Sequence, residues 1–151
     1  MAKLFYEDVQ VGTEVPELVK HPTTTQLVKW AGATQDPARI HYDKDYAQSV
    51  KLPGQIIHGF LKCQWLIQML TEWIGDDGNI KKINCRYLGM DLPDDTVKCK
   101  GKITKKYIQD NDHYIECDIW LGNQREEKTT TGSAIVSLPS NEGMFSYNRI
   151  I

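Results

Sequence analysis

The sequence has no excess of positive charge. Its 18 lysine and arginine residues are outnumbered by 20 aspartate and glutamate residues, so the formal net charge is −2. Because a protein that binds a nucleic-acid backbone must neutralise phosphates with basic side chains, this balance argues against a nucleic-acid partner. A small anionic ligand is compatible with the composition, since it needs positive charge only locally.

Long hydrophobic runs are also missing. The most apolar segment, residues 60–74, is interrupted by Lys62, Gln64, Gln68, Thr71 and Glu72, whereas a membrane-spanning helix needs about 20 predominantly apolar residues. At the N-terminus, the acidic pair Glu7-Asp8 arrives before the hydrophobic region of a secretory signal can develop. These two absences predict a cytoplasmic protein with no membrane partner.

Motifs for metals, disulfides and dinucleotides are absent as well. The cysteines contain no Cys-x-x-Cys pair, and no Gly-x-Gly-x-x-Gly occurs. Without a secretory signal the thiols are expected to be reduced, and neither a metal nor a cofactor is expected. Three cysteines stand among apolar residues in strand-like runs and are expected to be small side chains in or near the core: Cys85, Cys99 and Cys117.

What is present is the composition of an ordinary globular protein, with 40% hydrophobic and 25% charged residues over 151 positions. This length predicts one domain, residues 1–151. In the first half, Pro22 and the threonines after it predict the start of a helix that runs to Thr34, and Asp36-Pro37 ends it. A short helix is expected over 45–50. A longer helix over 59–73 is apolar almost all round, which predicts that it is buried.

The second half changes to an alternation of apolar and polar residues. Strands are expected over 80–87, 96–107, 113–121 and 125–138, and an earlier extended run within 6–19 supplies another. A long buried helix followed by antiparallel strands predicts an α+β fold in which the sheet wraps around the helix. One face of the late strands is expected to rest on Phe60, Leu61, Trp65, Leu66 and Met69. Two histidines, His21 and His113, are expected to be solvated.

The irregular stretch between the helices carries the candidate chemistry. Asp36 and His41 stand five positions apart across a proline turn, so a carboxylate and an imidazole can converge on one small molecule. Gly59 begins the long helix, where its main-chain amide and the helix N-terminus favour developing negative charge. An acid–base pair beside such a site is what the hydration of an α,β-unsaturated carbonyl requires.

Simpler interpretations of the same residues stay open. Asp36 can end one helix and cap the next turn, and His41 can be an ordinary loop histidine. Gly59 can be glycine because another segment packs closely against it. Arg39 and Asp43 are most simply a local ion pair, and His58 can be either a further acid–base group or structural.

Two stretches resemble the MaoC-like dehydratases, the (R)-specific enoyl-CoA hydratase (hydratase 2) family. Residues 33–47, which contain Asp36-Pro37-Ala38-Arg39-Ile40-His41, resemble the hydratase-2 motif, and Pro53-Gly54 followed by Ile57-His58-Gly59-Phe60-Leu61 resembles the segment that enters the central helix. The resemblance implies a hot-dog fold that hydrates an enoyl thioester of coenzyme A, with no cofactor. It implies Asp36 and His41 as the catalytic pair and the Gly59 amide as the oxyanion site, with His58 and Phe60 binding substrate.

The sequence departs from that motif around the pair. The usual form is Gly-Asp-x-Asn-Pro-(apolar)-His, but Gln35 precedes the aspartate here and Ala38-Arg39 replace Asn-Pro. The acyl group, its carrier and the physiological direction are therefore left open. One alternative is a hot-dog thioesterase, for which Glu72 is the only carboxylate in the central helix and lies far from Gly59. Another is a non-catalytic acyl-CoA-binding subunit of a hetero-oligomeric dehydratase.

The same resemblance implies an assembly, since hot-dog domains generally pair their sheets. A homodimer or higher homo-oligomer is expected, and a hetero-oligomer with a partner subunit is compatible with the motif changes. The nucleotide end of an acyl-CoA substrate would need basic side chains on the surface, for which the candidates are Lys81, Lys82 and Arg86.

Overall fold

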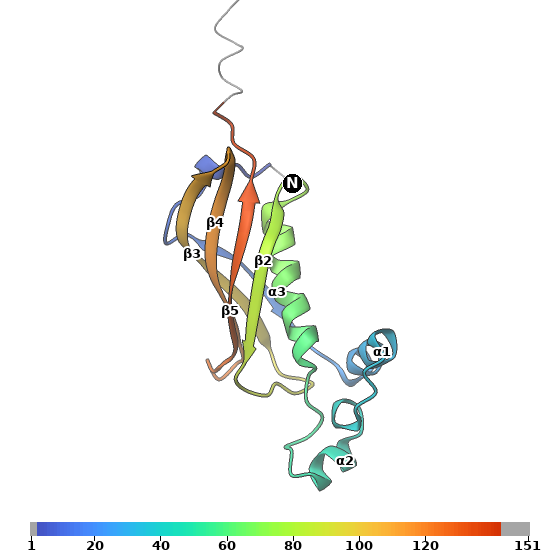
Figure 1. Cartoon of the computed structure of the whole chain (residues 1–151). Coiled ribbons are helices and arrows are strands. Elements are labelled where there is room, and N and C mark those ends of the chain that lie inside the picture. Colours follow the sequence, from blue (N-terminus) through green and yellow to red (C-terminus); the bar gives the residue numbers. More distant parts are fainter. Residues whose placement is uncertain (1–2, 143–151) are drawn as a thin grey trace, which may run out of the picture.

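An antiparallel sheet curves around one long helix, as Figure 1 shows for this computed structural model. The structure describes residues 3–142. Within them, the elements in chain order are η1 (Tyr6–Asp8, a 3-10 turn), β1 (Glu14–Lys20), α1 (Thr24–Thr34), η2 (Arg39–His41, a 3-10 turn), α2 (Lys44–Ser49), α3 (Gly59–Ile74), β2 (Asn79–Tyr87), β3 (Val97–Gln109), β4 (Asp112–Gly122) and β5 (Lys128–Leu138). The expected α+β architecture, with the sheet wrapped around the central helix, is confirmed.

The sheet has the strand order β1-β3-β4-β5-β2, and each neighbouring pair is antiparallel. β3, β4 and β5 follow one another along the chain and form its centre, whereas β1 and β2 are the two edges. The alternation expected in β4 is confirmed, since Ile115, Cys117, Ile119 and Leu121 are all buried. Cys99 is also buried and Cys85 half-buried, as expected.

α3 packs against the sheet with one face and leaves another uncovered. Its buried face includes Leu61, Trp65, Leu66 and Met69, as expected. The expectation that Phe60 packs under the strands was wrong, because this side chain is 73% exposed. Phe60 starts an outward stripe that continues with Gln64, and successive helical residues are rotated by about 100°. It therefore points away from the face that Leu61 and Trp65 bury.

Local capping explains the boundaries of the short elements. The Thr23 side chain accepts from the Gln26 amide at 3.2 Å and starts α1, and the Asp43 side chain accepts from the Tyr46 amide at 2.9 Å and starts α2. β5 begins at Lys128 rather than at the predicted Arg125. The reason is that the Asn123 side-chain oxygen accepts from the Arg125 amide at 2.9 Å, which holds a turn at this point.

Two further observations concern the surface. His113 was expected to be solvated, but it is half-buried and packs edge-on against Tyr6 with ring centroids 4.9 Å apart. Across the described residues, every helix is too short or too polar to cross a bilayer. In Figure 1, α1 and α2 lie beyond the sheet at the end where α3 begins, and the segments that carry Asp36, His41 and Gly59 lie at this end.

Candidate active site

The end of α1 directs Asp36 toward η2. Gln35 follows the helix in the left-handed conformation, with φ 55° and ψ 35°. The amides of both Gln35 and Asp36 donate to the carbonyl oxygen of Ala31, the latter at 3.1 Å. This is the kind of reversal that commonly ends a helix, and glycine usually occupies the left-handed position. Gln35 therefore occupies a conformation that is less strained for glycine than for a residue with a side chain.

His41, at the end of η2, is buried and held by the main chain. Its Nδ1 atom lies 2.7 Å from the carbonyl oxygen of Ile56. Because a carbonyl oxygen only accepts, Nδ1 must carry the proton of this hydrogen bond. The other ring nitrogen, Nε2, is then the unprotonated acceptor of the neutral imidazole. The geometry therefore prepares His41 to accept a hydrogen bond or a proton through Nε2.

His58 packs face to face against His41. The two rings are stacked, with centroids 3.7 Å apart and an angle of 22° between their planes. His58 is only 2% exposed, and neither of its ring nitrogens has a hydrogen-bond partner among the described residues. Burial lowers the pKa of His58, the charge of His41 lowers it further, and Asp36 acts in the opposite direction. Burial thus favours the neutral form of His58, whose ring packs against that of His41.

Asp36 completes the group and is the least buried of its three members. One ligand atom from each of Asp36, His41 and His58 can be chosen so that all lie within 4.8 Å of one another. Residues that are 22 positions apart at the extremes therefore meet at one point, as the sequence predicts for Asp36 and His41. A carboxylate and two imidazoles are also a donor set that a divalent cation accepts. The acid–base interpretation does not require a cation.

Gly59 is the first residue of α3, and its surroundings explain the glycine. Its N-cap residue, His58, provides no side-chain hydrogen bond to the first turn, so that side chain leaves the helix-start amides free to bind an anionic atom. A Cβ atom at position 59 would lie 3.1 Å from the ring of Tyr87. Close packing is therefore a sufficient reason for the glycine, and it is compatible with an oxyanion role for the amide.

A buried ion pair next to this helix start escaped the sequence analysis. Lys62 Nζ lies 3.0 Å from Asp91 Oδ2, and the side chains are 2% and 0% exposed. Lys62 was interpreted only as a polar interruption of an apolar helix. The spacing of Lys62 from Leu66 and Met69, which lie on the same buried helix face, could have predicted its burial. A lysine on a buried face requires an acceptor, because an unpaired buried charge is very unfavourable.

The other predicted residues lie on the surface. Lys81, Lys82 and Arg86 are exposed on the edge strand β2. Arg39 and Asp43 form the expected local ion pair, with 2.7 Å between Nη2 and Oδ2. Glu72 is exposed in the last turn of α3, about 20 Å along the axis from Gly59 at a rise of about 1.5 Å per residue. A thioesterase site that combines Glu72 with Gly59 is therefore not formed.

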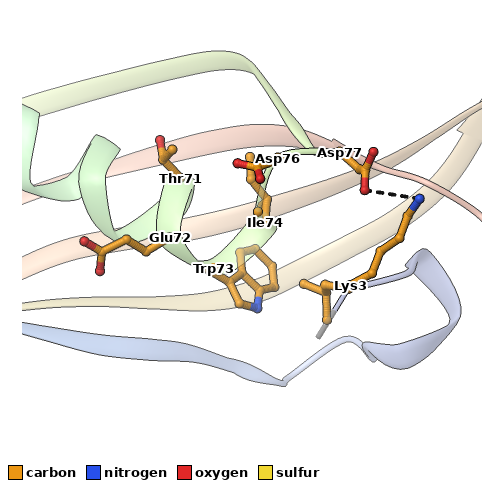
Figure 2. Close-up of a pocket in the computed structure, with 9 residues that line it drawn as sticks. Lys3, Thr71, Glu72, Trp73, Ile74, Asp76 and Asp77 are labelled. Carbon is orange, nitrogen blue, oxygen red and sulfur yellow. Dashed lines mark ion pairs between the residues drawn. The ribbon is translucent and has the colours of Figure 1, made fainter. Parts of the chain in front are cut away.

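A hollow of about 380 Å³ lies at the other end of α3, and Figure 2 shows the residues that line it. It is lined by Trp73 and by the acidic residues Glu72, Asp76 and Asp77, and Lys3 pairs with Asp77 at 3.1 Å. This hollow shares no residue with the group formed by Asp36, His41 and His58. Its acidic lining is unsuited to an anionic ligand.

Known proteins resemble this chain in sequence and in fold. The family model described as "MaoC like domain" matches residues 8–119. Among solved structures, the (R)-hydratase from A. caviae involved in PHA biosynthesis is 19% identical, with a TM-score of 0.80, over 88% of this chain and 99% of that one. The R-hydratase PhaJ1 from Pseudomonas aeruginosa is 18% identical, with a TM-score of 0.83, over 91% and 87% of the two chains.

A third similar structure is a complex of two different proteins. The ChsH1-ChsH2 complex from Mycobacterium tuberculosis contains a chain that is 25% identical, with a TM-score of 0.75, and the match covers 85% of this chain and 98% of that one. Together these likenesses show that the chain has the hot-dog fold.

Proposed function

Because this chain belongs to the family of the MaoC-like domain, we propose that it adds water to an enoyl thioester of coenzyme A, or removes water from the 3-hydroxyacyl thioester. One observation carries the proposal. Asp36 and His41 meet beside the start of α3, and the bond from His41 Nδ1 to the Ile56 carbonyl leaves Nε2 free. This supplies an acid–base pair next to helix-start amides.

The hydration step follows from these roles. A water molecule donates one hydrogen bond to Asp36 and one to His41 Nε2, and Asp36 removes a proton as the water oxygen bonds to the β-carbon. The electrons of the carbon–carbon double bond move toward the thioester carbonyl, whose oxygen becomes an enolate. The pair then returns the proton to the α-carbon, so the elements of water are added and nothing is oxidised or reduced. Dehydration is the same sequence in reverse.

The thioester oxygen is stabilised by the start of α3. The Gly59 amide points at developing negative charge, and the helix dipole adds a favourable field in a partly dry site. Near this point Phe60, Tyr87, Leu88 and Met90 expose apolar surface. Such surface suits an acyl chain, and Lys81, Lys82 and Arg86 are the basic candidates for its nucleotide end.

The chain is proposed to work as an oligomer. Among residues 3–142, β2 is an edge strand that pairs with another strand on one side only, which suits pairing with a second copy. The likeness to a chain of the ChsH1-ChsH2 complex makes a second, different subunit the alternative. Gln35, Ala38 and Arg39 alter the motif around the catalytic pair, and a subunit that binds acyl-CoA without turning it over is the corresponding alternative function.

The test is the loss of enoyl-thioester absorbance when the purified protein meets crotonyl-CoA, with a thiol reagent in a parallel sample. Wild-type protein should consume the alkene without releasing thiol. Asp36→Asn and His41→Ala should each lower the rate by a factor of about 10² to 10⁴, the usual contribution of a positioned acid–base group.

Matched controls are Asp45→Asn and His21→Ala, which change exposed side chains of the same types. Both should keep the wild-type rate. Equal rates in wild type, Asp36→Asn and His41→Ala would refute the assignment. Thiol release would instead indicate a thioesterase, and tight acyl-CoA binding without reaction until a second subunit is added would indicate a binding subunit.

A further inference from the structure

The buried ion pair of Lys62 and Asp91 lies immediately beneath the helix start. Lys62 is in the first turn of α3, and Asp91 is in the segment that connects β2 to β3. Besides Asp91 Oδ2 at 3.0 Å, Lys62 Nζ donates to the carbonyl oxygen of Gly89 at 2.8 Å. The helix start is therefore tied to two points of a connection that comes 27 or more residues later.

Asp91 is itself held from several sides. The Thr129 hydroxyl of β5 donates to Asp91 Oδ2 at 2.6 Å, and the main-chain amide of Ile57 donates to the Asp91 carbonyl oxygen at 2.8 Å. Ile57 directly precedes the N-cap His58, and Lys62 follows Gly59 by three residues. Asp91 therefore bonds to the chain on both sides of the helix start, and Thr129 connects it to the sheet.

The cover over Gly59 depends on the same contacts. The Tyr87 ring comes within 3.1 Å of the position that a Cβ atom of residue 59 would take, and Lys62 Nζ lies 6.0 Å from the centre of that ring. Tyr87 is the last residue of β2, and Gly89 follows it by two positions. Lys62 therefore fixes the segment that lies against Gly59 as well as the helix that carries it.

We propose that Lys62 and Asp91 are positioning residues for the Gly59 amide. The proposal rests on the proposed function, in which that amide binds the thioester oxygen. A buried ion pair contributes little to stability compared with an apolar pair of the same volume, and its use lies in selecting one arrangement. Oxyanion donors need this selection, because a displacement of about 1 Å can cost roughly 10²-fold in rate.

The test replaces both partners at once with side chains of similar volume, as Lys62→Met/Asp91→Leu. Removing both charges avoids leaving one of them unpaired. The Thr129 hydroxyl loses Asp91 but keeps the Leu121 carbonyl oxygen as an acceptor at 3.5 Å, so the double variant should fold and unfold near the wild-type temperature. Its kcat for crotonyl-CoA should fall by about 10- to 100-fold, while KM stays within about twofold. The pH dependence of kcat should keep its shape, since Asp36 and His41 are unchanged.

The control is Lys106→Met. Lys106 also donates to two main-chain carbonyls, those of Tyr6 and Val9. It lies near the C-terminal end of β3, whereas the connection that contains Asp91 leads into the N-terminal end of this strand. Its loss should leave kcat at the wild-type value. A fall in kcat as large as that of the double variant would mean that the loss of any lysine bonded to main-chain carbonyls disturbs the sheet, and it would overturn the specific role of Lys62.

The direct readout is the infrared carbonyl stretch of bound butyryl-CoA, a saturated thioester that cannot be hydrated. A hydrogen bond from the Gly59 amide should shift this band to lower frequency in the wild type and in Asp36→Asn, and the shift should be lost in the double variant. A wild-type shift that persists in the double variant overturns the positioning role alone. No shift in any protein, with wild-type hydration of crotonyl-CoA absent, overturns the proposed function as well.

Discussion

The ring of His41 stacks on the ring of His58 at 3.7 Å, with its Nδ1 atom bonded to the Ile56 carbonyl. The stacking fixes the plane of the ring, and the hydrogen bond fixes the rotation of the ring within that plane. Nε2 is consequently aimed in one direction without any contact from a ligand. Such preorganisation reduces the reorientation that a catalytic base must undergo during reaction.

The bond to Ile56 predicts the tautomer of His41. In the neutral ring we expect the proton on Nδ1, whereas isolated histidine prefers the tautomer with the proton on Nε2. Nitrogen-15 chemical shifts of the histidine rings measure this directly, and the His41→Gln variant identifies the signals. A protonated Nε2 in neutral His41 would contradict the hydrogen-bond direction and remove the proposed acceptor of water.

Burial of His58 predicts a loss of stability in mild acid. The folded-state pKa is lowered, so the unfolded state binds more protons over the range between the two pKa values. This contribution to stability is complete above the unfolded pKa of about 6.5 and is lost as the pH falls below it.

Urea unfolding between pH 8 and pH 5 tests this dependence. His58→Leu should show a smaller decrease in the free energy of unfolding over the same range, whatever its absolute stability. His21→Ala, which changes an exposed ring, should keep the wild-type dependence. Parallel curves for wild type and His58→Leu would show that another group is responsible.

The left-handed conformation of Gln35 predicts a stabilising substitution. A side chain at φ 55° costs roughly 1 kcal/mol relative to glycine, so Gln35→Gly should raise the free energy of unfolding by about that amount. Gln35→Ala retains the Cβ atom and should give no such gain. Denaturant unfolding of the three proteins measures the difference, and a loss of stability in Gln35→Gly would mean that contacts of the glutamine side chain outweigh the backbone strain.

The packing of Tyr87 on Gly59 predicts a destabilising substitution that can be reversed. Gly59→Ala places a Cβ atom 3.1 Å from the Tyr87 ring, which should lower the free energy of unfolding by about 1 to 3 kcal/mol. Adding Tyr87→Ala removes the obstacle and should recover most of this loss. Because alanine keeps the main-chain amide, the hydration rate of Gly59→Ala/Tyr87→Ala reports whether this amide functions without the Tyr87 ring against it. A double variant no more stable than Gly59→Ala would show that the glycine is needed for another reason.

Much of the architecture follows from patterns within short stretches of sequence. The period of two in β4 indicates which side chains enter the core, and the hydroxyl of Thr23 and the carboxylate of Asp43 mark helix starts a few residues away. These interactions are local, so neighbouring residues are enough to predict them. The turn at Gly122-Asn123 is local too, and the sequence predicts it. Only the start of the next strand was wrong, because the Thr-rich run was counted as strand from Arg125 although β5 begins at Lys128. The candidate pair Asp36 and His41 also lies within one short motif, whose meaning came from resemblance to a family rather than from spacing alone.

The tertiary structure alone decided which side chains from distant segments come into contact. The stacking of His41 on His58, the packing of Tyr87 on Gly59 and the pairing of Lys62 with Asp91 each join parts of the chain that no local pattern connects. The exposure of Phe60 belongs here as well, because an apolar residue at the start of a helix is buried only if another segment reaches it. By itself the sequence determined which residues are chemically able to form the site and which faces are buried. Their distances and directions depend on how the sheet closes around α3, because the energy that holds them comes from contacts made only after folding.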